Sequence, residues 1–362
     1  MLQKISSRIL LWSSIVLATG LLLSAWLPYL NPGKFWVAGF SGFFFPILFP
    51  VCLLLLPLLW WYKMKMPLLL CGIALCCAIP AALVTWSFHP VNAGEGTVAN
   101  SFTLMTYNSS SMGLVAYKTE EARVAAIYDM IRKARPGILC MQEFYSNDQA
   151  GREHHIDSIM RTGNYGWHYF TCDKTHWNTW YYGISLFSRY PILSASSIPC
   201  GKSSAGSGSS FLQADLAING DTIRIFSVHL TSYMFNSEDY NNMSAPGSSS
   251  LIYKMRSTFE KRSAQALQLA ALVAESPYPA IVCGDFNDTP VSFTYKTVSH
   301  NMKDVFLETG NGLGRTLSFL SPTLRIDYLL AQPSFSIHSG GVLQIHPSEH
   351  FPVMACLSLK KH

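Results

Sequence analysis

The sequence predicts an α/β domain preceded by three membrane-spanning helices, and two observations support this prediction. Three long apolar stretches without charged residues lie within the first 88 of the 362 positions. Behind them, short apolar runs that end in turn residues alternate with segments in which apolar residues recur at helical spacing. Such alternation of strand and helix patterns is typical of α/β proteins.

The three apolar stretches cover about residues 9–30, 35–62 and 67–88, and each exceeds the ~20 residues that a helix needs to cross a bilayer. Prolines within them would break a soluble helix but are tolerated in membrane spans, where neighbouring helices satisfy the freed carbonyls. A signal peptide explains one such stretch, but it does not explain three. We therefore expect residues 1–88 to form a membrane anchor.

Basic residues predict the orientation of this anchor. Lys4 and Arg8 precede the first stretch, and Lys63 and Lys65 lie between the second and third. The loop between the first and second stretches holds only Lys34. The positive-inside bias therefore places the N-terminus and the second loop in the cytoplasm. Three spans then put the rest of the chain outside, so we expect a multi-pass protein of the cell (inner) membrane with an extracytoplasmic domain.

The positive charge of the chain is concentrated in the anchor. Five of the 26 basic residues and one of the 21 acidic residues fall within positions 1–100, so residues 101–362 carry 21 basic against 20 acidic groups. A protein that follows a nucleic-acid backbone usually has a clear basic excess. The composition thus permits a nucleic-acid partner without favouring one, and it identifies no protein partner.

Five of the nine cysteines lie beyond the anchor. Cys140, Cys283 and Cys356 occur in apolar strand-like runs and are most simply small buried hydrophobes. Cys172 and Cys200 could pair if the domain is extracytoplasmic, but the sequence does not decide whether they do.

Residues 89–101 form a short linker rich in small and polar residues. At ~3.3 Å per residue this linker spans at most ~40 Å, so the domain that covers residues 102–362 stays near the bilayer surface. The domain opens with an alternating strand that ends at Asn108. Thr119 is then expected to cap a helix. A buried strand follows over residues 138–143 and closes on the carboxylate of Glu143.

Residues 144–182 combine four histidines with many aromatic side chains. The histidines lack compact zinc-ligand spacing, which favours structural or surface roles. The aromatic residues suit a core, a base-stacking platform or an apolar lip that faces the membrane. Base stacking usually comes with interleaved cations, and few occur here. We therefore expect a core together with the wall of a substrate pocket.

The next segment predicts a hairpin followed by a long helix. A glycine- and serine-rich loop is expected at residues 201–210. Two alternating strands are then joined at Asn219-Gly220-Asp221, which is a strong hairpin signal, and the second strand delivers His229. Residues 254–275 have the apolar spacing of a helix.

Residues 280–290 carry the clearest site motif. An apolar run suited to a buried strand ends in Gly284, Asp285 and Asn287, and turn residues follow. Carboxylates at the junction of a strand and a loop commonly bind metal or activate water. A capped strand end is the alternative for this stretch taken alone. Further along, a strand over residues 324–330 carries Asp327, a short strand is expected around residues 304–306, and residues 353–359 form the last strand.

Polar groups of catalytic type therefore follow several predicted strands. In this order they resemble the endonuclease/exonuclease/phosphatase superfamily, metal-dependent phosphoesterases that share a fold with deoxyribonuclease I. The resemblance extends over essentially all of the domain. It is carried by TYN at 106–108, QEF at 142–144, GISLFSRYPI at 183–192, VHLTS at 228–232, GDFND at 284–288, RIDYLL at 325–330 and SEHFPV at 348–353.

The resemblance implies a four-layer α/β sandwich, in which helices flank two central mixed sheets. It also implies a metal site, at which Glu143 would hold Mg²⁺ or Mn²⁺ with help from Asn108 and from Glu349. Oxygen ligands suit such hard ions. Members of the family usually have Asp at the position of Glu349. They also often have Asn where this chain has Ser209 and Ser210, which weakens the expectation for phosphate contacts.

The same resemblance implies roles for five further residues. Asp285 would accept a proton from the attacking water, and Asn287 would orient the phosphate or the nucleophile. Asp327 would fix and charge His350, which would stabilise the negative charge of the transition state. His229 would contact the phosphate or protonate the leaving oxygen.

The predicted function is a membrane-tethered, divalent-metal-dependent phosphodiesterase that hydrolyses a phosphoester by in-line attack of an activated water. A phospholipid headgroup or another small phosphoester is the expected substrate. The alternative is an extracytoplasmic endonuclease or exonuclease. A second alternative is a catalytically silent binding module, which the retained acids and histidines oppose.

Overall fold

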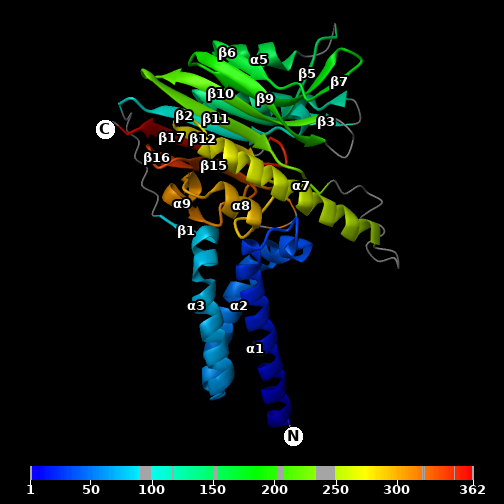
Figure 1. Ribbon diagram of the computed structural model, residues 1–362, viewed down its shortest axis with the longest axis vertical. Helices are drawn as coiled ribbons and strands as arrows, with labels where there is room; N and C mark the ends of the chain where they lie inside the picture. Colours follow the sequence, from blue (N-terminus) through cyan, green and yellow to red (C-terminus); the bar gives the residue numbers. More distant parts are fainter. Residues whose placement is uncertain are drawn as a thin grey trace.

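The computed structural model describes residues 2–89, 99–115, 118–149, 154–202, 208–233, 249–319, 321, 323–345 and 347–360. Within these residues, three long helices project from one side of a domain built around two sheets (Figure 1). The N-terminus lies at the far end of the helices from the domain.

The projecting helices are α1 (Leu2–Trp26), α2 (Ser41–Trp61) and α3 (Lys65–Thr85). The turns η1 (Leu27–Tyr29) and η2 (Trp36–Phe40) connect α1 to α2. All three helices are long and apolar enough to cross a membrane, with candidate spans at Ser7–Tyr29, Trp36–Trp61 and Lys65–Thr85. The prediction of three such helices is therefore confirmed.

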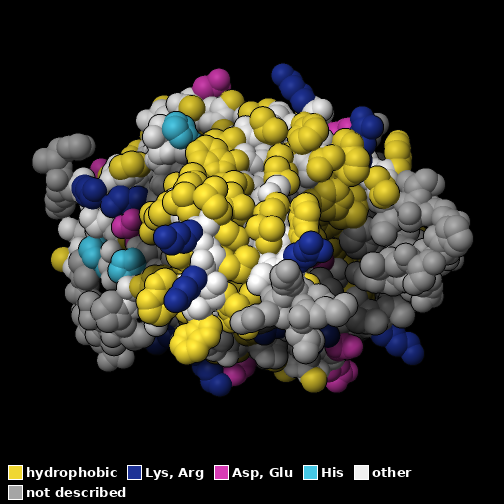
Figure 2. All heavy atoms as spheres, turned by 90° about the horizontal axis from the view of Figure 1, so that it is seen from below, with side chains coloured by type: hydrophobic (Ala, Val, Ile, Leu, Met, Phe, Trp, Pro, Cys, Tyr) yellow, Lys and Arg dark blue, Asp and Glu magenta, His cyan; other side chains and the backbone are white. Residues whose placement is uncertain are grey.

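Small side chains line the contacts between these helices, including Ala18, Cys52, Cys71, Ala74 and Ala78. Small residues let helices approach closely where hydrophobic driving force is weak, as in a bilayer. On the face seen from the helix end, hydrophobic side chains cover the middle, and Lys and Arg side chains lie among and around them (Figure 2).

The third helix is shorter than the apolar stretch that predicted it. It ends at Thr85, and Ser87–Phe88 instead form strand β1, which pairs with β14 (Asn311–Gly312) of the domain. The last residues of the expected anchor are thus part of the domain's hydrogen bonding.

The first domain sheet has six strands in the order β13-β15-β12-β11-β10-β9. Their bounds are β9 (Ile192–Lys202), β10 (Gly208–Ile218), β11 (Asp221–His229), β12 (Ala280–Asp285), β13 (Lys303–Asp304) and β15 (Asp327–Ala331). The hairpin at Asn219-Gly220 is confirmed, since Ile218 pairs with Asp221 and both turn residues have positive φ.

The second sheet has seven strands, in the order β16-β17-β2-β5-β8-β6 with β7 also paired to β8. Their bounds are β2 (Phe102–Asn108), β5 (Ile138–Asn147), β6 (Trp167–Phe170), β7 (Lys174–His176), β8 (Trp180–Ser188), β16 (Phe335–Val342) and β17 (Val353–Leu359). Apolar side chains of both sheets form one core between them, among them Leu104, Leu186, Ile225 and Ile281.

Helices cover the outer faces of both sheets. Helix α7 (Ser249–Ala274) packs on the six-stranded sheet through Ala266 and Leu269. On the seven-stranded sheet lie α4 (Glu121–Ala134), which buries Ile127, and α5 (His155–Gly163), which buries Ile159. The predicted four-layer sandwich is confirmed.

Short elements complete the domain. They are η3 (Ser111–Gly113), β3 (Leu114–Val115), β4 (Lys118–Thr119), α8 (Phe293–Val298) and α9 (Val305–Thr309).

Three local predictions were wrong. Thr119 does not cap a helix, because it pairs with Leu114 in β4 and Glu120 occupies the capping position of α4. The strand expected around residues 304–306 ends at Asp304, whose carboxylate accepts the Phe306 N–H at 2.9 Å and starts α9. The loop expected at 201–210 is strand at both ends, where β9 and β10 pair.

Cysteines form no disulfide among the described residues, and Cys172 and Cys200 are both free. Cys172 is exposed, whereas Cys200 is buried under α7, where its carbonyl accepts a hydrogen bond from Gln265 at 3.1 Å. Cys140 and Cys283 are buried as predicted, but Cys356 is only partly buried.

Candidate active site

The sheet register brings polar residues to one end of the six-stranded sheet. Strands β11 and β12 are parallel, and His229 pairs with Asp285 at their ends. The neighbouring antiparallel strand β15 places Asp327 opposite Asp285. Three of the predicted residues, distant in sequence, are therefore adjacent across the sheet.

Gly284 allows the backbones of β11 and β12 to approach closely at this end of the sheet. Its φ is +135°, and a Cβ there would lie 2.0 Å from the carbonyl oxygen of Val228 on β11. Only glycine fits where two backbones approach so closely with this conformation. The glycine of the GDFN motif is thus required by the fold.

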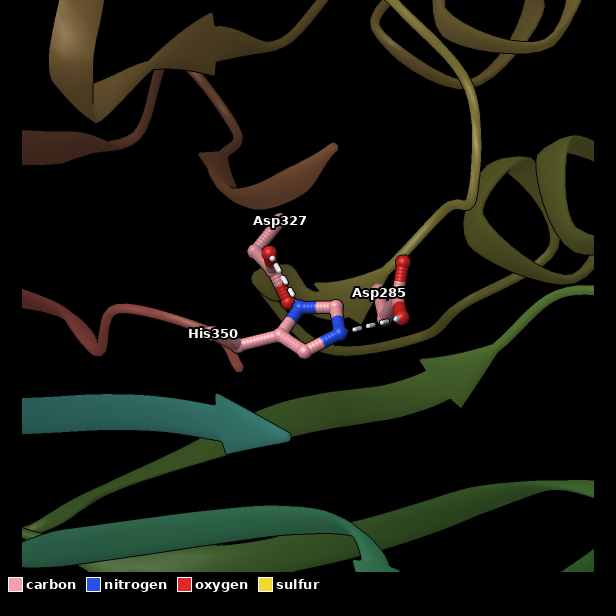
Figure 3. Close-up of side chains that lie close together, drawn as sticks. All are labelled: Asp285, Asp327 and His350. Carbon is pink, nitrogen blue, oxygen red and sulfur yellow. Dashed lines mark hydrogen bonds and ion pairs between the residues drawn. The ribbon is translucent and has the colours of Figure 1, made fainter. Parts of the chain in front are cut away.

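Asp285, Asp327 and His350 form a buried group (Figure 3). His350 Nδ1 lies 3.0 Å from Asp327 Oδ2, and His350 Nε2 lies 3.9 Å from Asp285 Oδ2. The imidazole thus lies between two carboxylates, one on each side. Ligand atoms of these three residues all lie within 4.8 Å of one another.

The charges of this group follow from its burial and its pairing. Burial raises the pKa of Asp327 to about 6, although the neighbouring His350 opposes the shift. Burial lowers the pKa of His350, but the carboxylates of Asp327 and Asp285 outweigh that effect and raise it to about 10. At neutral pH the pair is therefore an aspartate and an imidazolium.

The seven-stranded sheet contributes Asn108 and Glu143 from β2 and β5. The Asn108 side-chain amide donates to Glu143 Oε1 at 3.2 Å and to Asp285 Oδ2 at 3.0 Å. His229 Nε2 lies 3.6 Å from Glu143 Oε1 and 3.8 Å from Asp285 Oδ2. Asn108 therefore links the two sheets through their acidic residues.

Glu143 has a backbone conformation that few residues of its type adopt. Its φ is +47°, and the β5–β8 register shifts between Met141 and Phe144, as in a β-bulge. Ser109 Oγ donates to the Glu143 carbonyl at 3.0 Å and supports the bulge. Strained residues cluster at functional sites, where a bulge can redirect one side chain.

Asn287 connects the loop that follows β12, to which it belongs, with the loop that follows β11. Its backbone N–H donates to Asp285 Oδ1 at 2.8 Å, and its side-chain amide donates to the Leu230 carbonyl at 3.0 Å. Leu230 follows His229. Asn287 thus fixes the Asp285 carboxylate and holds the end of β11 beside it.

Glu349 lies outside the group that the other predicted residues form. Its side chain is exposed, whereas its neighbours Ser348 and His350 are buried. The chain bends at residues 347–349, where the Ser348 hydroxyl accepts the His350 N–H at 3.1 Å, and Glu349 faces solvent between these two buried neighbours. Among the described residues, the Glu349 carboxylate forms no ion pair with any basic side chain. Ser210, one of the two serines at the position where an Asn was expected, donates a hydrogen bond to Asp173.

The sequence reasoning missed two residues that support the site. Thr316 Oγ1 accepts the Asp327 N–H at 3.1 Å and the Ile326 N–H at 2.9 Å, and it is buried. Tyr182 lies beside Glu143. Burial is the main cause that raises the pKa of its phenol, and the Glu143 carboxylate is the next largest. Tyr182 belongs to the aromatic stretch that predicted a pocket wall, whereas Thr316 follows a glycine-rich segment and carries no local signal.

Several other residues of that aromatic and histidine stretch are structural, whereas Trp167 and Trp177 are exposed. Tyr165 lies in the core of the seven-stranded sheet, with Phe170 and Trp180 packed against it. His155 is buried, with Nδ1 2.7 Å from the Tyr128 hydroxyl, and His154 caps α5. The expected structural roles fit these contacts.

The residues of the site fit a divalent cation. The carboxylate of Glu143 is a suitable donor for a hard ion, and so is the side-chain oxygen of Asn108, which accepts the Ser110 N–H at 3.0 Å. Among the described residues, Asp327 Oδ1 and His229 Nε2 are buried without a hydrogen-bond partner, and buried polar atoms are rarely left so. His350 is not a suitable ligand while it is protonated. The fit therefore favours the side of the site that holds Glu143.

Comparison with known proteins agrees with this geometry. Residues 105–350 match the model of the endonuclease/exonuclease/phosphatase family, and the chain belongs to this family. Its members are hydrolases of phosphoester bonds and generally use divalent metals. Residues 7–85 match a second model, described as a domain of unknown function (DUF8431). No curated protein matches the chain.

Solved structures show the same fold. The endonuclease/exonuclease/phosphatase from Beutenbergia cavernae is 19% identical with a TM-score of 0.53, covering 72% of each chain. The human Nocturnin catalytic domain with bound sulfate is 19% identical with a TM-score of 0.52, covering 73% of this chain and 96% of its own. D. rerio TDP2 complexed with single strand DNA product is 13% identical with a TM-score of 0.51, covering 71% and 99%.

Proposed function

We propose that this chain is a membrane-tethered, divalent-metal-dependent phosphodiesterase. The observation that carries the proposal is the single group formed by Asp285, Asp327, His350, Asn108, Glu143 and His229. A buried acid, a charged imidazole and an oxygen-rich open side are what in-line attack of water on a phosphate requires.

Asp285 is the proposed base for the attacking water. One of its oxygens accepts the Asn287 N–H and the other accepts from Asn108, so the carboxylate is held in one orientation. Fixed orientation favours proton transfer from a water bound within hydrogen-bond distance. Asn287 completes this corner by holding Leu230, and with it the loop behind His229.

His350 is the proposed stabiliser of the transition state. Its imidazolium is held at 3.0 Å by Asp327, so the positive charge needs no reorganisation when negative charge develops on the phosphate. His229 lies at the less buried side of the group and is proposed to contact the phosphate or protonate the leaving oxygen.

Glu143, with Asn108, is proposed to hold Mg²⁺ or Mn²⁺. A bound ion would neutralise charge on a phosphate oxygen. The Glu143 side chain is 27% exposed, which leaves it open to an ion and substrate. Glu349 is not included, because its side chain is exposed away from this group.

We also propose that residues 1–88 are a membrane anchor, residues 89–101 a linker and residues 102–362 the catalytic domain. The N-terminus lies at the opposite end of the helices from the domain, which agrees with an extracytoplasmic domain under the positive-inside bias (Figure 1). A tethered domain with nearly balanced charge favours a phospholipid headgroup or another small phosphoester as substrate.

An extracytoplasmic nuclease is the second candidate. The fold similarity to D. rerio TDP2 in complex with a single strand DNA product favours it. The domain's lack of basic excess opposes it. A silent binding module is the least favoured, because the acids and histidines are retained and mutually bonded.

The test uses the full-length protein purified in detergent. We expect hydrolysis of bis(p-nitrophenyl) phosphate that needs added Mg²⁺ or Mn²⁺ and stops with EDTA. Parallel assays on phospholipid vesicles, a single-stranded oligonucleotide and a phosphomonoester then rank the substrate classes. A folded protein without metal-dependent turnover on any of these substrates would contradict the proposal.

A further inference from the structure

The helical anchor is packed directly against the catalytic domain. The Phe40 ring of η2 lies 5.1 Å from the Phe259 ring of α7, and Lys296 Nζ of α8 lies 3.5 Å from the Tyr29 ring centre. Buried Arg325 donates to the Val84 carbonyl of α3 at 2.6 Å. These contacts lie on several elements, so the domain is docked rather than held by the linker alone.

One of these contacts involves the loop that follows the GDFN motif. A Cβ on Gly42, in the first turn of α2, would lie 2.1 Å from Thr289 Oγ1 and 2.3 Å from the Val291 carbonyl oxygen. Thr289 is buried, and Val291 belongs to the same apolar cluster as the anchor helices. Glycine at position 42 therefore allows α2 to touch this loop.

The loop is short and has little freedom to absorb a displacement. Asp285 and Asn287 lie only a few residues before Thr289 in the chain. Between them, Asp288 accepts the Thr294 hydroxyl at 2.7 Å and the Thr289 N–H at 3.1 Å. A shift at Thr289 is thus transmitted toward Asn287 and Asp285.

A buried arginine connects this loop to the loop behind His229. Arg262 of α7 lies 3.4 Å from Asp288 Oδ2, and its Nε donates to the Thr231 carbonyl at 2.9 Å. Its Nη1 donates to the Tyr233 hydroxyl at 3.2 Å. The Tyr233 ring in turn lies 5.9 Å from the Phe43 ring of α2. The first turn of α2 therefore touches both loops.

We infer that the first turn of α2, through Gly42 and Phe43, is a positioning element of the active site. It holds the loop with Asp285 and Asn287 on one side and, through Tyr233 and Arg262, the loop behind His229 on the other. The inference rests on the proposed function. It makes the membrane helix part of the support of the catalytic groups, and a displacement of about 1 Å costs up to about a hundredfold in rate.

The first test compares glycine substitutions in the full-length protein, assayed with bis(p-nitrophenyl) phosphate and Mg²⁺ or Mn²⁺. We expect Gly42→Ala to lower kcat by about tenfold to a hundredfold with little change in KM. Gly72→Ala in α3 is the matched control, because no atom of the residues that the structure describes lies within 4 Å of a Cβ there. It should keep wild-type kcat.

A second control separates positioning from general destabilisation. Gly163→Ala places a Cβ 2.0 Å from the Tyr165 ring in the domain. We expect it to lower Tm while the folded protein keeps wild-type kcat. If kcat instead falls with Tm equally in Gly42→Ala and Gly163→Ala, the positioning role is wrong.

Phe43→Leu tests the contact between Phe43 and Tyr233 without introducing a clash. It also tests the positioning role if Gly42→Ala fails to fold. We expect a several-fold lower kcat, whereas Phe44→Leu, at a residue that is 57% exposed, should leave kcat unchanged. Wild-type kcat in folded Phe43→Leu, or in folded Gly42→Ala, would overturn the inference. An inactive wild-type protein would instead overturn the proposed function.

Discussion

The two sheets contribute unlike halves to the candidate site. The six-stranded sheet supplies Asp285 and Asp327, which are fully buried and, with His350, form a chain of ionic contacts. The seven-stranded sheet supplies Asn108 and Glu143, and the Glu143 carboxylate remains partly open to solvent on a left-handed bulge. Burial keeps the charged pair of Asp327 and His350 in one arrangement. A ligand for an ion that exchanges with solvent must instead be accessible, as Glu143 is.

Among the substitutions considered, a change at the buried acid Asp285 should lower turnover the most. We expect Asp285→Asn to lower turnover by about three orders of magnitude or more, because the amide cannot accept the proton of the attacking water. Turnover of bis(p-nitrophenyl) phosphate by the folded variant measures this, with circular dichroism to confirm folding. Wild-type-like turnover would rule out Asp285 as the base.

Removing the imidazolium should be nearly as severe. His350→Gln deletes the positive charge that Asp327 holds at 3.0 Å, and we expect a loss of about a hundredfold to a thousandfold in kcat. The measurement is kcat at saturating metal. A loss confined to KM would show that His350 binds substrate without stabilising the transition state.

A change at the partly exposed Glu143 should mainly alter the metal concentration that activity requires. We expect Glu143→Gln to raise the Mg²⁺ concentration needed for half-maximal activity by at least about tenfold, since a charged oxygen ligand is lost. Metal titration of activity checks this, and Asp285→Asn serves as the contrast because its loss should persist at saturating metal. An unchanged metal titration in Glu143→Gln would remove Glu143 from the metal site.

The same contrast predicts a pH dependence of stability. The pKa of His350 is raised to about 10 in the fold from an ordinary 6.5, so the charged imidazole stabilises the protein fully below about pH 6.5. This contribution falls as the pH rises through about 10. Wild type should therefore exceed His350→Gln in Tm at pH 7, and the gap should narrow toward pH 10 in metal-free buffer. A gap independent of pH would show that His350 is not held protonated.

The smallest effect is expected at Glu349. Its side chain is exposed, and substitutions at such positions usually change free energies by no more than about 0.5 kcal/mol, or about twofold in rate. We expect Glu349→Gln to keep kcat and the metal titration within this range. A loss comparable to that of Glu143→Gln would restore the metal role that the sequence predicted for Glu349.

Much of the fold was predictable because its signals are local. Apolar length identified the three helices, and the Asn219-Gly220 turn fixed the hairpin before His229. Errors arose where a neighbour in space decided the outcome. Thr119 has the chemistry of a helix cap, yet pairing with Leu114 placed it in a strand. Asp304 follows the pattern of a strand, yet its carboxylate starts a helix.

Local signals in the sequence identify which acids, amides and histidines end the strands, since apolar runs and turn residues act over a few positions. How these side chains are combined depends on contacts between distant segments. The strand register joined Asp285, Asp327 and His229, the bulge redirected Glu143, and the bend at residues 347–349 left Glu349 in solvent. Contact between Gly42 and Thr289 depends on residues some 250 positions apart that meet only when the helices and the domain are both folded.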